Sequence, residues 1–181
     1  MKKYVIVLLC LCSLWACKNE TQKLAKEMRH VIGQHVIIPD YAEAKVLGES
    51  VPIPDSLFKK ANILVYTPPL FCTSCNLDCL EEWKTFMNEL ETVSQIGFVF
   101  IFKPKREKEL TATLKEFNFD YPVIYDTKNE FIKKNPCISH PVFYVILLDE
   151  NNCIRLTGNP VGNETLWKLY KQQIKTLLTE E

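Results

Sequence analysis

Short runs of consecutive apolar residues alternate along the chain with longer segments whose apolar residues recur every three or four positions. A short apolar run is typical of a buried strand, whereas the spacing of three to four is typical of an amphipathic helix. This pattern predicts strands over residues 63–66, 96–102, 123–125, 142–148 and 153–156. It predicts helices over residues 73–91, 105–118, 129–134 and 163–178.

Strands that alternate with helices predict a sheet with parallel pairs, because each crossover helix returns the chain to the same edge. Residues 149–152, Asp-Glu-Asn-Asn, form a polar turn that adds one antiparallel hairpin. We therefore expect an α/β fold, βαβαβ followed by ββα, with a central mixed β-sheet flanked by helices. Upstream, residues 21–33 predict a short helix, residues 35–39 a short strand, and residues 40–56 an irregular connection broken by glycine and prolines.

The composition is that of one globular domain. Of the 181 residues, 47% are hydrophobic and 24% charged, which excludes a disordered or collagen-like chain. Lys plus Arg and Asp plus Glu both number 22, so the formal net charge is zero. Phosphate binding needs a cationic surface, so we do not expect nucleic acid as a partner.

The N-terminus predicts an export signal. Lys2 and Lys3 precede an apolar run over residues 4–16, which has the length of a signal peptide's apolar region and is short for a membrane-spanning helix. The run ends in Leu-Trp-Ala-Cys17, which resembles the lipobox of bacterial lipoproteins, although a tryptophan stands where a small residue is usual. The resemblance implies that Cys17 is acylated. The alternative is an ordinary cleaved signal in which Cys17 is incidental.

These features divide the chain into three parts. Residues 1–16 are the expected lipoprotein signal peptide, residues 17–54 a tether and N-terminal extension, and residues 55–181 the folded domain. Acyl chains on Cys17 would hold the protein on a membrane surface. We therefore expect it in the bacterial cell envelope, lipid-anchored to a membrane and facing the periplasm or the exterior. Disulfides persist in such oxidising compartments.

The chemistry of the chain centres on Cys72-Thr-Ser-Cys75, which follows the strand 63–66 and opens the helix 73–91. At a helix N-terminus, unpaired N–H groups and the macrodipole favour a thiolate over a thiol. Cys72 is then the attacking nucleophile. Cys75 lies almost one helical turn further on, so its sulfur can close onto Cys72 and release a mixed-disulfide partner.

This arrangement resembles the thioredoxin fold, and in particular the membrane-attached thiol-disulfide oxidoreductases of the TlpA and ResA type. The resemblance covers about residues 55–181. It rests on the CxxC at a helix start, on residues 121–126 (Tyr-Pro-Val-Ile-Tyr-Asp), and on the apolar strand and hairpin of residues 141–152. It implies a redox-active disulfide at the CxxC and protein thiols or disulfides as substrates.

The resemblance also implies a substrate groove beside the CxxC. In that family a cis-proline faces the two cysteines, and Pro141 holds the corresponding place. The alternative is a trans proline at the first position of a strand. The implied groove residues are Phe71, Thr73, Ser74, His140 and Pro141.

Two departures distinguish this chain from the family. Phe71 stands where a tryptophan is usual before the first cysteine, and the motif contains no proline. Tyr66 occupies the place of the buried acid that serves the resolving thiol of thioredoxins. We therefore expect a slower or specialised exchange, with no organic cofactor and no metal.

Cys79 leaves a second function open. It continues the apolar stripe that runs from Cys75 to Trp83 and Leu90, so the simpler interpretation is a packed core residue. Alternatively, Cys75, Cys79 and His140 resemble the copper ligands of Sco-type delivery proteins, since thiolates are soft ligands. The protein would then be a copper-binding delivery protein.

Two further cysteines follow. Cys137 lies four residues before Pro141 and is either an extra redox thiol or a free loop thiol, whereas Cys153 is expected to pack at a strand start. The sequence thus favours an envelope thiol-disulfide oxidoreductase acting through Cys72 and Cys75. A non-catalytic thioredoxin-like binding scaffold is the remaining alternative.

Overall fold

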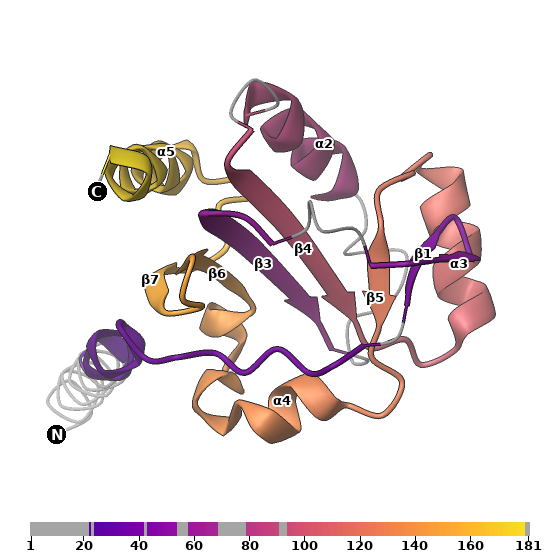
Figure 1. The fold of residues 1–181 in the computed structure, drawn as a ribbon, viewed down its shortest axis with the longest axis horizontal. Helices are drawn as coiled ribbons and strands as arrows, with labels where there is room; N and C mark the ends of the chain where they lie inside the picture. The colour runs from indigo at the N-terminus through magenta and orange to yellow at the C-terminus, as the bar shows by residue number, and fades with distance from the viewer. Residues whose placement is uncertain are drawn as a thin grey trace, which may run out of the picture.

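A seven-stranded mixed sheet forms the centre of the fold, with its strands in the order β2-β1-β5-β4-β3-β6-β7 (Figure 1). The computed structural model describes residues 22, 24–41, 43–53, 58–68, 79–90 and 94–179. The strands are β1 (Ala44–Val46), β2 (Glu49–Val51), β3 (Ala61–Thr67), β4 (Ile96–Phe102), β5 (Val123–Tyr125), β6 (Val145–Asp149) and β7 (Ile154–Thr157). The helices are α2 (Cys79–Leu90), α3 (Glu107–Glu116), α4 (Glu130–Lys134) and α5 (Glu164–Thr179). Residues 22 and 24–31 are also helical and are called the N-terminal helix below.

The three central strands are parallel and are joined by helical crossovers. β3 pairs with β4, and β4 with β5, so both crossovers step in the same direction along the sheet. Crossovers between parallel strands are right-handed, which places α2 and α3 on the same face. The C-terminal helix α5 packs on this face too, and Figure 1 shows α2 and α5 on the side of the sheet opposite α4.

Both faces of the central strands are covered. In β3, Ile63 and Val65 point to the face of α2, whereas Leu64 and Tyr66 point to the face of α4. All four side chains are buried, as expected for a central strand with helices on both sides. The same reasoning explains why β4 is a continuous apolar run.

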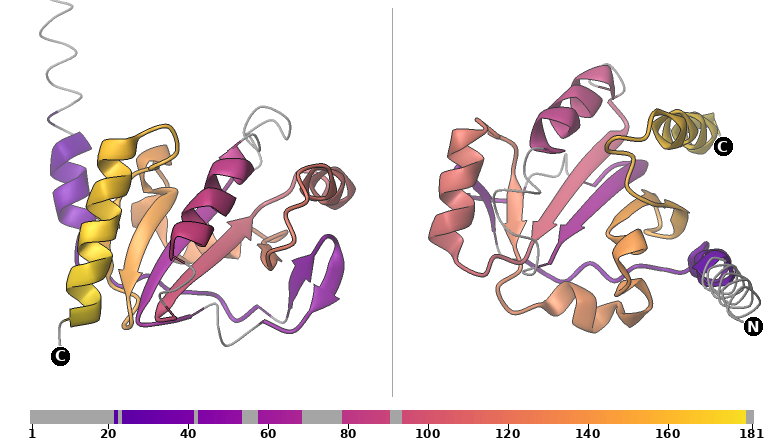
Figure 2. Two further views of the ribbon diagram at one scale, coloured as in Figure 1. Left: turned by 90° about the horizontal axis from the view of Figure 1, so that it is seen from above. Right: turned by 180° about the vertical axis from the view of Figure 1, so that it is seen from behind.

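The second face is covered by the chain that returns from β5 to β6. It runs through α4 and two short 3-10 helices, η2 (Pro136–Ile138) and η3 (Pro141–Phe143). The N-terminal helix lies beside β7, at the end of the sheet opposite the β1–β2 hairpin (Figure 2). The backbone N–H of Gly33 donates to the carbonyl of Ile154 across 2.7 Å and fixes this arrangement.

Most predicted elements are present. β4 and β5 have the predicted bounds, and β3, β7, α3, α4 and α5 differ from the prediction only at their ends. Within the predicted helix 73–91, residues 79–90 are helical and the other positions lie outside the described residues.

The predicted strand over residues 35–39 is wrong. Within the part of the chain that the structure describes, its only ladder contact is an isolated bridge between His35 and Cys153. Beyond that bridge, the side chain of Asn135 takes the place of a neighbouring strand. It accepts from the Ile37 N–H at 2.8 Å and donates to the Ile37 carbonyl at 2.7 Å.

The irregular connection expected over residues 40–56 is also wrong, because it contains the β1–β2 hairpin. Leu47 and Gly48 form its turn with φ angles of 50° and 92°. Positive φ at both central residues matches the twist of a two-residue hairpin. β1 also pairs with β5, where Lys45 lies opposite Val123, and so extends the sheet. Residues that the sequence assigned to the N-terminal extension thus contribute two strands.

None of the helices in the described part of the chain is long and apolar enough to span a bilayer. The predicted signal over residues 1–16 and the predicted acylation site Cys17 lie outside the described residues.

Candidate functional site

The carboxyl end of β3 lies next to the turn that leads into β6. β6 is antiparallel to β3, so β6 begins at the end of the sheet where β3 finishes, and Val65 lies opposite Val145. The N–H of Tyr66 donates to the carbonyl of Tyr144 at 2.7 Å. Residues 68–78 connect β3 to α2, and the connection therefore starts beside the η3 turn.

The predicted reactive motif falls in this connection. Cys72 and Cys75, with the predicted groove residues Phe71, Thr73 and Ser74, lie outside the described residues. Of the predicted groove, the structure describes only His140 and Pro141. Both are exposed, on the turn that abuts the end of β3.

The expected cis-proline is not found. The described residues contain no cis peptide bond, and Pro141 opens η3 instead of a strand. A trans proline suits this first helical position, where its missing N–H would have no partner. His140 precedes it with an extended backbone, and its Nδ1 accepts from the Val142 N–H at 3.3 Å. The strand β6 accordingly begins later than predicted, at Val145.

Tyr66, which occupies the place of the family's buried acid, lies on the face of the sheet opposite α2. Only 3% of it is exposed, and its hydroxyl donates to Oδ1 of Asn129 at 2.9 Å. Its ring contacts those of Phe131 and Tyr144, with centroids 5.3 and 5.4 Å away. Burial, with a smaller contribution from the Asp126 carboxylate, raises the pKa of Tyr66 above its ordinary value. Tyr66 is thus a neutral donor at this position.

Asp126 is a buried acid that the sequence analysis did not single out. It is 2% exposed and follows β5 directly. Its two carboxylate oxygens accept from the backbone N–H groups of Glu130 and Phe131, at 2.8 and 3.0 Å. Burial and the nearby Asp126 carboxylate raise the pKa of Tyr41. An Asp just before a predicted helix start is a capping signal, which could have identified this residue.

The described cysteines differ in their surroundings. Cys79 is half-buried at the start of α2 and packs against the core on that face, as its place in the apolar stripe predicts. Cys153 is half-buried opposite His35. Cys137 is exposed in η2, and none of the three is in a disulfide with another.

The metal alternative stays a prediction. Among the residues that the structure describes, no three His, Cys, Asp or Glu side chains are grouped as a metal site. The predicted copper set of Cys75, Cys79 and His140 includes Cys75, which lies outside them.

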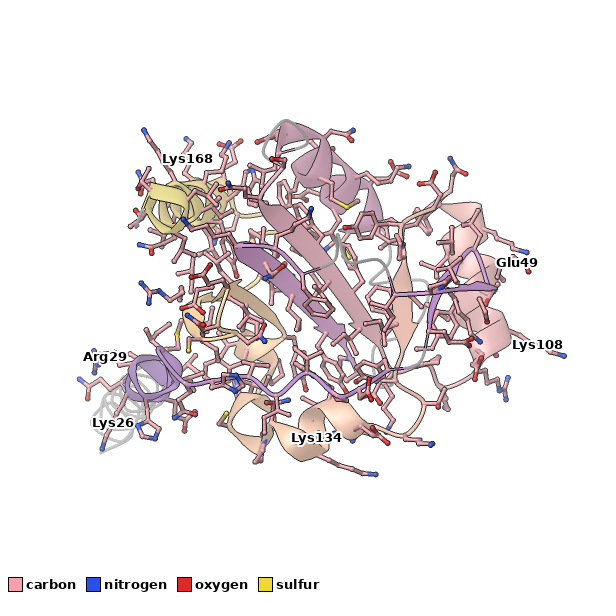
Figure 3. All side chains as sticks on the ribbon, viewed as in Figure 1. Lys26, Arg29, Glu49, Lys108, Lys134 and Lys168 are labelled. Atoms are coloured by element: carbon pink, nitrogen blue, oxygen red, sulfur yellow. The ribbon has the colours of Figure 1, made fainter. Side chains whose placement is uncertain are left out.

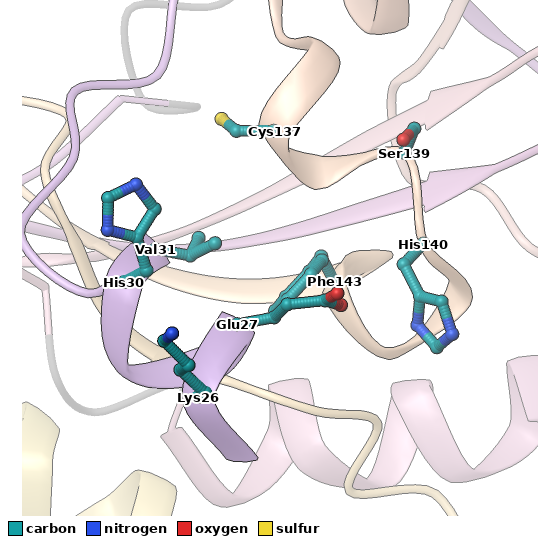
Figure 4. A pocket seen from close by; sticks show the side chains of 8 residues that line it. All are labelled: Lys26, Glu27, His30, Val31, Cys137, Ser139, His140 and Phe143. Carbon is teal, nitrogen blue, oxygen red and sulfur yellow. The ribbon is translucent and has the colours of Figure 1, made fainter. Parts of the chain in front are cut away.

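A pocket of about 640 Å³ lies between the N-terminal helix and the η2–η3 segment (Figure 4). It brings Cys137 and His140, two of the predicted site residues, to one cavity. We call it the helix–turn pocket. Its lining residues are Lys26, Glu27, His30, Val31, Cys137, Ser139, His140 and Phe143. Sequence reasoning missed the contribution of the N-terminal helix, because its residues are over a hundred positions away from Cys137 in the chain.

No family model and no curated protein matches the sequence. The fold, however, is similar to those of solved thiol-disulfide oxidoreductases. A domain from Cytophaga hutchinsonii, described as a possible thiol-disulfide isomerase, is 16% identical, with a TM-score of 0.54 over 80% of this chain and 96% of that one.

Two Bacteroides proteins show the same similarity. A thiol-disulfide oxidoreductase from Bacteroides fragilis is 15% identical, with a TM-score of 0.51 over 72% of this chain and 99% of that one. The thioredoxin domain of a thiol-disulfide oxidoreductase from Bacteroides vulgatus is 14% identical, with a TM-score of 0.50 over 76% and 96%. Together with the mixed sheet and its covering helices, these similarities show that the chain has a thioredoxin-like fold.

Proposed function

We propose that the protein is a thiol-disulfide oxidoreductase that acts through Cys72 and Cys75. The observation that carries the proposal is the juxtaposition at the end of β3. The connection that contains both cysteines in sequence leaves the sheet beside the η3 turn, with the Tyr66 N–H bonded to the Tyr144 carbonyl. The solved structures with similar folds support the same activity, since two of them are thiol-disulfide oxidoreductases.

The proposed exchange has two steps. The Cys72 thiolate attacks one sulfur of a substrate disulfide, and the other substrate sulfur leaves as a thiolate. The Cys75 thiolate then attacks the Cys72 sulfur and releases the second substrate sulfur. The substrate gains two electrons and the protein gains a Cys72–Cys75 disulfide, while the reverse sequence oxidises a substrate dithiol. Protein thiols and disulfides are the proposed substrates.

The exchange is proposed to proceed without a carboxylate at the position of Tyr66. The Tyr66 hydroxyl is engaged with Asn129, and its raised pKa keeps its proton in place at neutral pH. The Cys75 proton would therefore leave to solvent or to the departing substrate thiolate. This supports the expectation of slow or specialised exchange.

A redox titration of the full-length chain tests the proposal. The protein is equilibrated in glutathione buffers of graded potential, and the alkylation of each cysteine is measured by peptide mass spectrometry. We expect Cys72 and Cys75 to oxidise together, and Cys75→Ser to leave Cys72 in mixed disulfides with substrate proteins. Cys153→Ser is the matched control and should change neither result.

Two outcomes would count against the exchange. Cys72 and Cys75 could fail to pair at every potential, which would favour the scaffold alternative. Cys75 could instead pair with Cys79, which would favour the copper-binding set. Copper titration of the wild type, Cys79→Ser and His140→Gln proteins then distinguishes the scaffold from the copper-binding protein, because only the latter loses copper when Cys79 or His140 is replaced.

We further propose that Cys17 carries the lipid anchor and holds the protein in the cell envelope. The support is the charged start, the apolar run and the Leu-Trp-Ala-Cys17 sequence. Mass spectrometry of the N-terminal peptide should find diacylglycerol on Cys17, and Cys17→Ser should leave the membrane fraction. A protein that stays in the membrane after this change has another anchor.

A further inference from the structure

We propose that the helix–turn pocket binds a small disulfide whose halves carry carboxylate and ammonium groups, such as glutathione disulfide. One half of the bound disulfide is transferred to Cys137. This inference goes beyond the proposed function and does not rest on Cys72 or Cys75. It joins two features that the proposed exchange does not use, the N-terminal helix and the Cys137 thiol.

The cavity has the size and floor of a small-molecule site. Its volume of about 640 Å³ falls within the range of ligand pockets. Val31 and Phe143, which are 3% and 2% exposed, form its apolar base. Both belong to the core of the second face, so the base of the pocket is held in place by the packing of the whole domain.

The rim carries both signs of charge. Lys26 and Glu27 follow one another on the N-terminal helix, and Figure 4 shows Lys26 on the side of His30 and Glu27 directed toward Phe143. His140 and Ser139 line the other wall. A ligand with carboxylate and ammonium groups matches such a rim, because each group finds a partner of opposite charge. Cysteine and glutathione disulfides carry both groups.

The nucleophile belongs to the same cavity. Cys137 lines the pocket from η2, and Figure 4 shows its Sγ above His30 and Val31. It is the most exposed of the three described cysteines, because Cys79 and Cys153 are half-buried. A ligand seated over Val31 and Phe143 would therefore place its disulfide within reach of this thiol.

The proposed step balances without another reagent. The Cys137 thiolate attacks one sulfur of the bound disulfide, so a Cys137–S–S–R bond forms and the R–S–S–R bond breaks. The other half leaves as the thiolate, RS⁻. One protein thiol is oxidised to a mixed disulfide and one small thiol is released, and the thiol proton passes to solvent.

The test measures adduct formation at Cys137 in the full-length Cys72→Ser/Cys75→Ser protein. The probes are glutathione disulfide, neutral hydroxyethyl disulfide and cationic cystamine, with adducts quantified by peptide mass spectrometry. Each rate is divided by the rate at Cys137 in the urea-unfolded chain, which removes the intrinsic reactivity of the probe. We expect this normalised rate to be higher for glutathione disulfide than for either of the other two probes.

A second part of the test changes the charge of the pocket rim. Lys26→Gln should lower the folded-state preference for glutathione disulfide by about 1.5- to 5-fold, the size expected of one exposed charge contact. Lys168→Gln, on α5 apart from Lys26 (Figure 3), is the matched control and should leave the preference unchanged. Both lysines are exposed, and a circular dichroism spectrum verifies that each variant is folded.

Two results would overturn the inference. The first is equal normalised rates for all three probes, which would make Cys137 an ordinary exposed thiol. The second is an equal decrease of the preference for glutathione disulfide in Lys26→Gln and in Lys168→Gln. The preference would then be due to the overall charge of the protein and not to the pocket. Since Cys72 and Cys75 are absent from the test protein, neither result bears on the proposed exchange.

Discussion

The backbone N–H of Tyr66 donates to the carbonyl of Tyr144 across 2.7 Å, which joins the end of β3 to the turn before β6. The two tyrosine rings also meet edge to face, with centroids 5.4 Å apart. The turn with His140 and Pro141 is therefore fixed to the strand from which the CxxC connection departs. This contact makes the end of β3 the place where the proposed chemistry and its groove would meet.

Tyr66→Phe should make the protein less sensitive to alkali. The pKa of Tyr66 lies above its ordinary value of 10.0 in the folded protein, so above about pH 10 the unfolded chain loses a proton that the folded chain keeps. The contribution of the neutral Tyr66 to the free energy of unfolding is thus fully present below that pH and is lost as the pH rises. Urea unfolding of wild type and variant at neutral and alkaline pH measures the difference.

The comparison for this prediction is Tyr144→Phe. Burial also raises the pKa of Tyr144, but less than that of Tyr66, and its hydroxyl donates to the Ser139 carbonyl near the surface, so this variant should reduce the alkaline decline less. At neutral pH Tyr66→Phe should cost about 1 kcal/mol, because it removes the bond to Asn129. An alkaline decline as steep as that of the wild type would show that other groups cause it. Tyr41 and Tyr170, whose pKa values are raised by burial, would then be the next to replace.

Trp167→Ala and Glu89→Gln should separate packing from charge between α2 and α5. The Trp167 ring is stacked on Phe86 with centroids 4.0 Å apart, and its indole N–H donates to Glu89 at 2.9 Å. Trp167 is buried, so its truncation should cost about 3–5 kcal/mol. Glu89 is largely exposed and also binds Lys171, so its neutralisation should cost under about 1 kcal/mol. Equal losses in chemical unfolding would refute this division.

The central elements could be predicted because their burial is imposed by the sheet itself. β4 is covered on both faces, so its residues form one apolar run with unmistakable ends. α5 has one apolar stripe, which ends with the helix. In these elements local pattern and final environment agree.

The features that the sequence did not predict depend on contacts between residues that are distant in the chain. Asp126 looks like a turn residue in sequence, and its burial follows only from the docking of Tyr41 and α4 around it. The helix–turn pocket unites Lys26 with Cys137, a relation that no local pattern records. The cis form of Pro141 was carried over from the family resemblance, and the η3 turn replaces it here.

Gly48→Ala should destabilise the protein more than Gly33→Ala. Both glycines have positive φ, 92° and 82°, so both variants incur about 1–2 kcal/mol of backbone strain. A Cβ on Gly48 would also lie 2.4 Å from Cγ2 of Thr111, whereas one on Gly33 meets nothing within 4 Å. Thr111→Ser removes that methyl group. Added to Gly48→Ala, it should restore part of the lost stability in urea unfolding, and strict additivity would contradict the clash.

Asn135→Ala should release the segment that joins the N-terminal helix to the sheet. The Asn135 side chain bonds both backbone groups of Ile37 and the Phe131 carbonyl, and it is 3% exposed. Its loss leaves these groups without their partner, which costs about 1–3 kcal/mol. Hydrogen exchange should then quicken at Ile37 more than at Val36, which keeps its bond to Asn152. Asn135→Asp is the matched comparison, because it retains an acceptor for the Ile37 N–H but loses the donor. If both variants exchange like the wild type at Ile37, the segment is held by the burial of Val36 and not by Asn135.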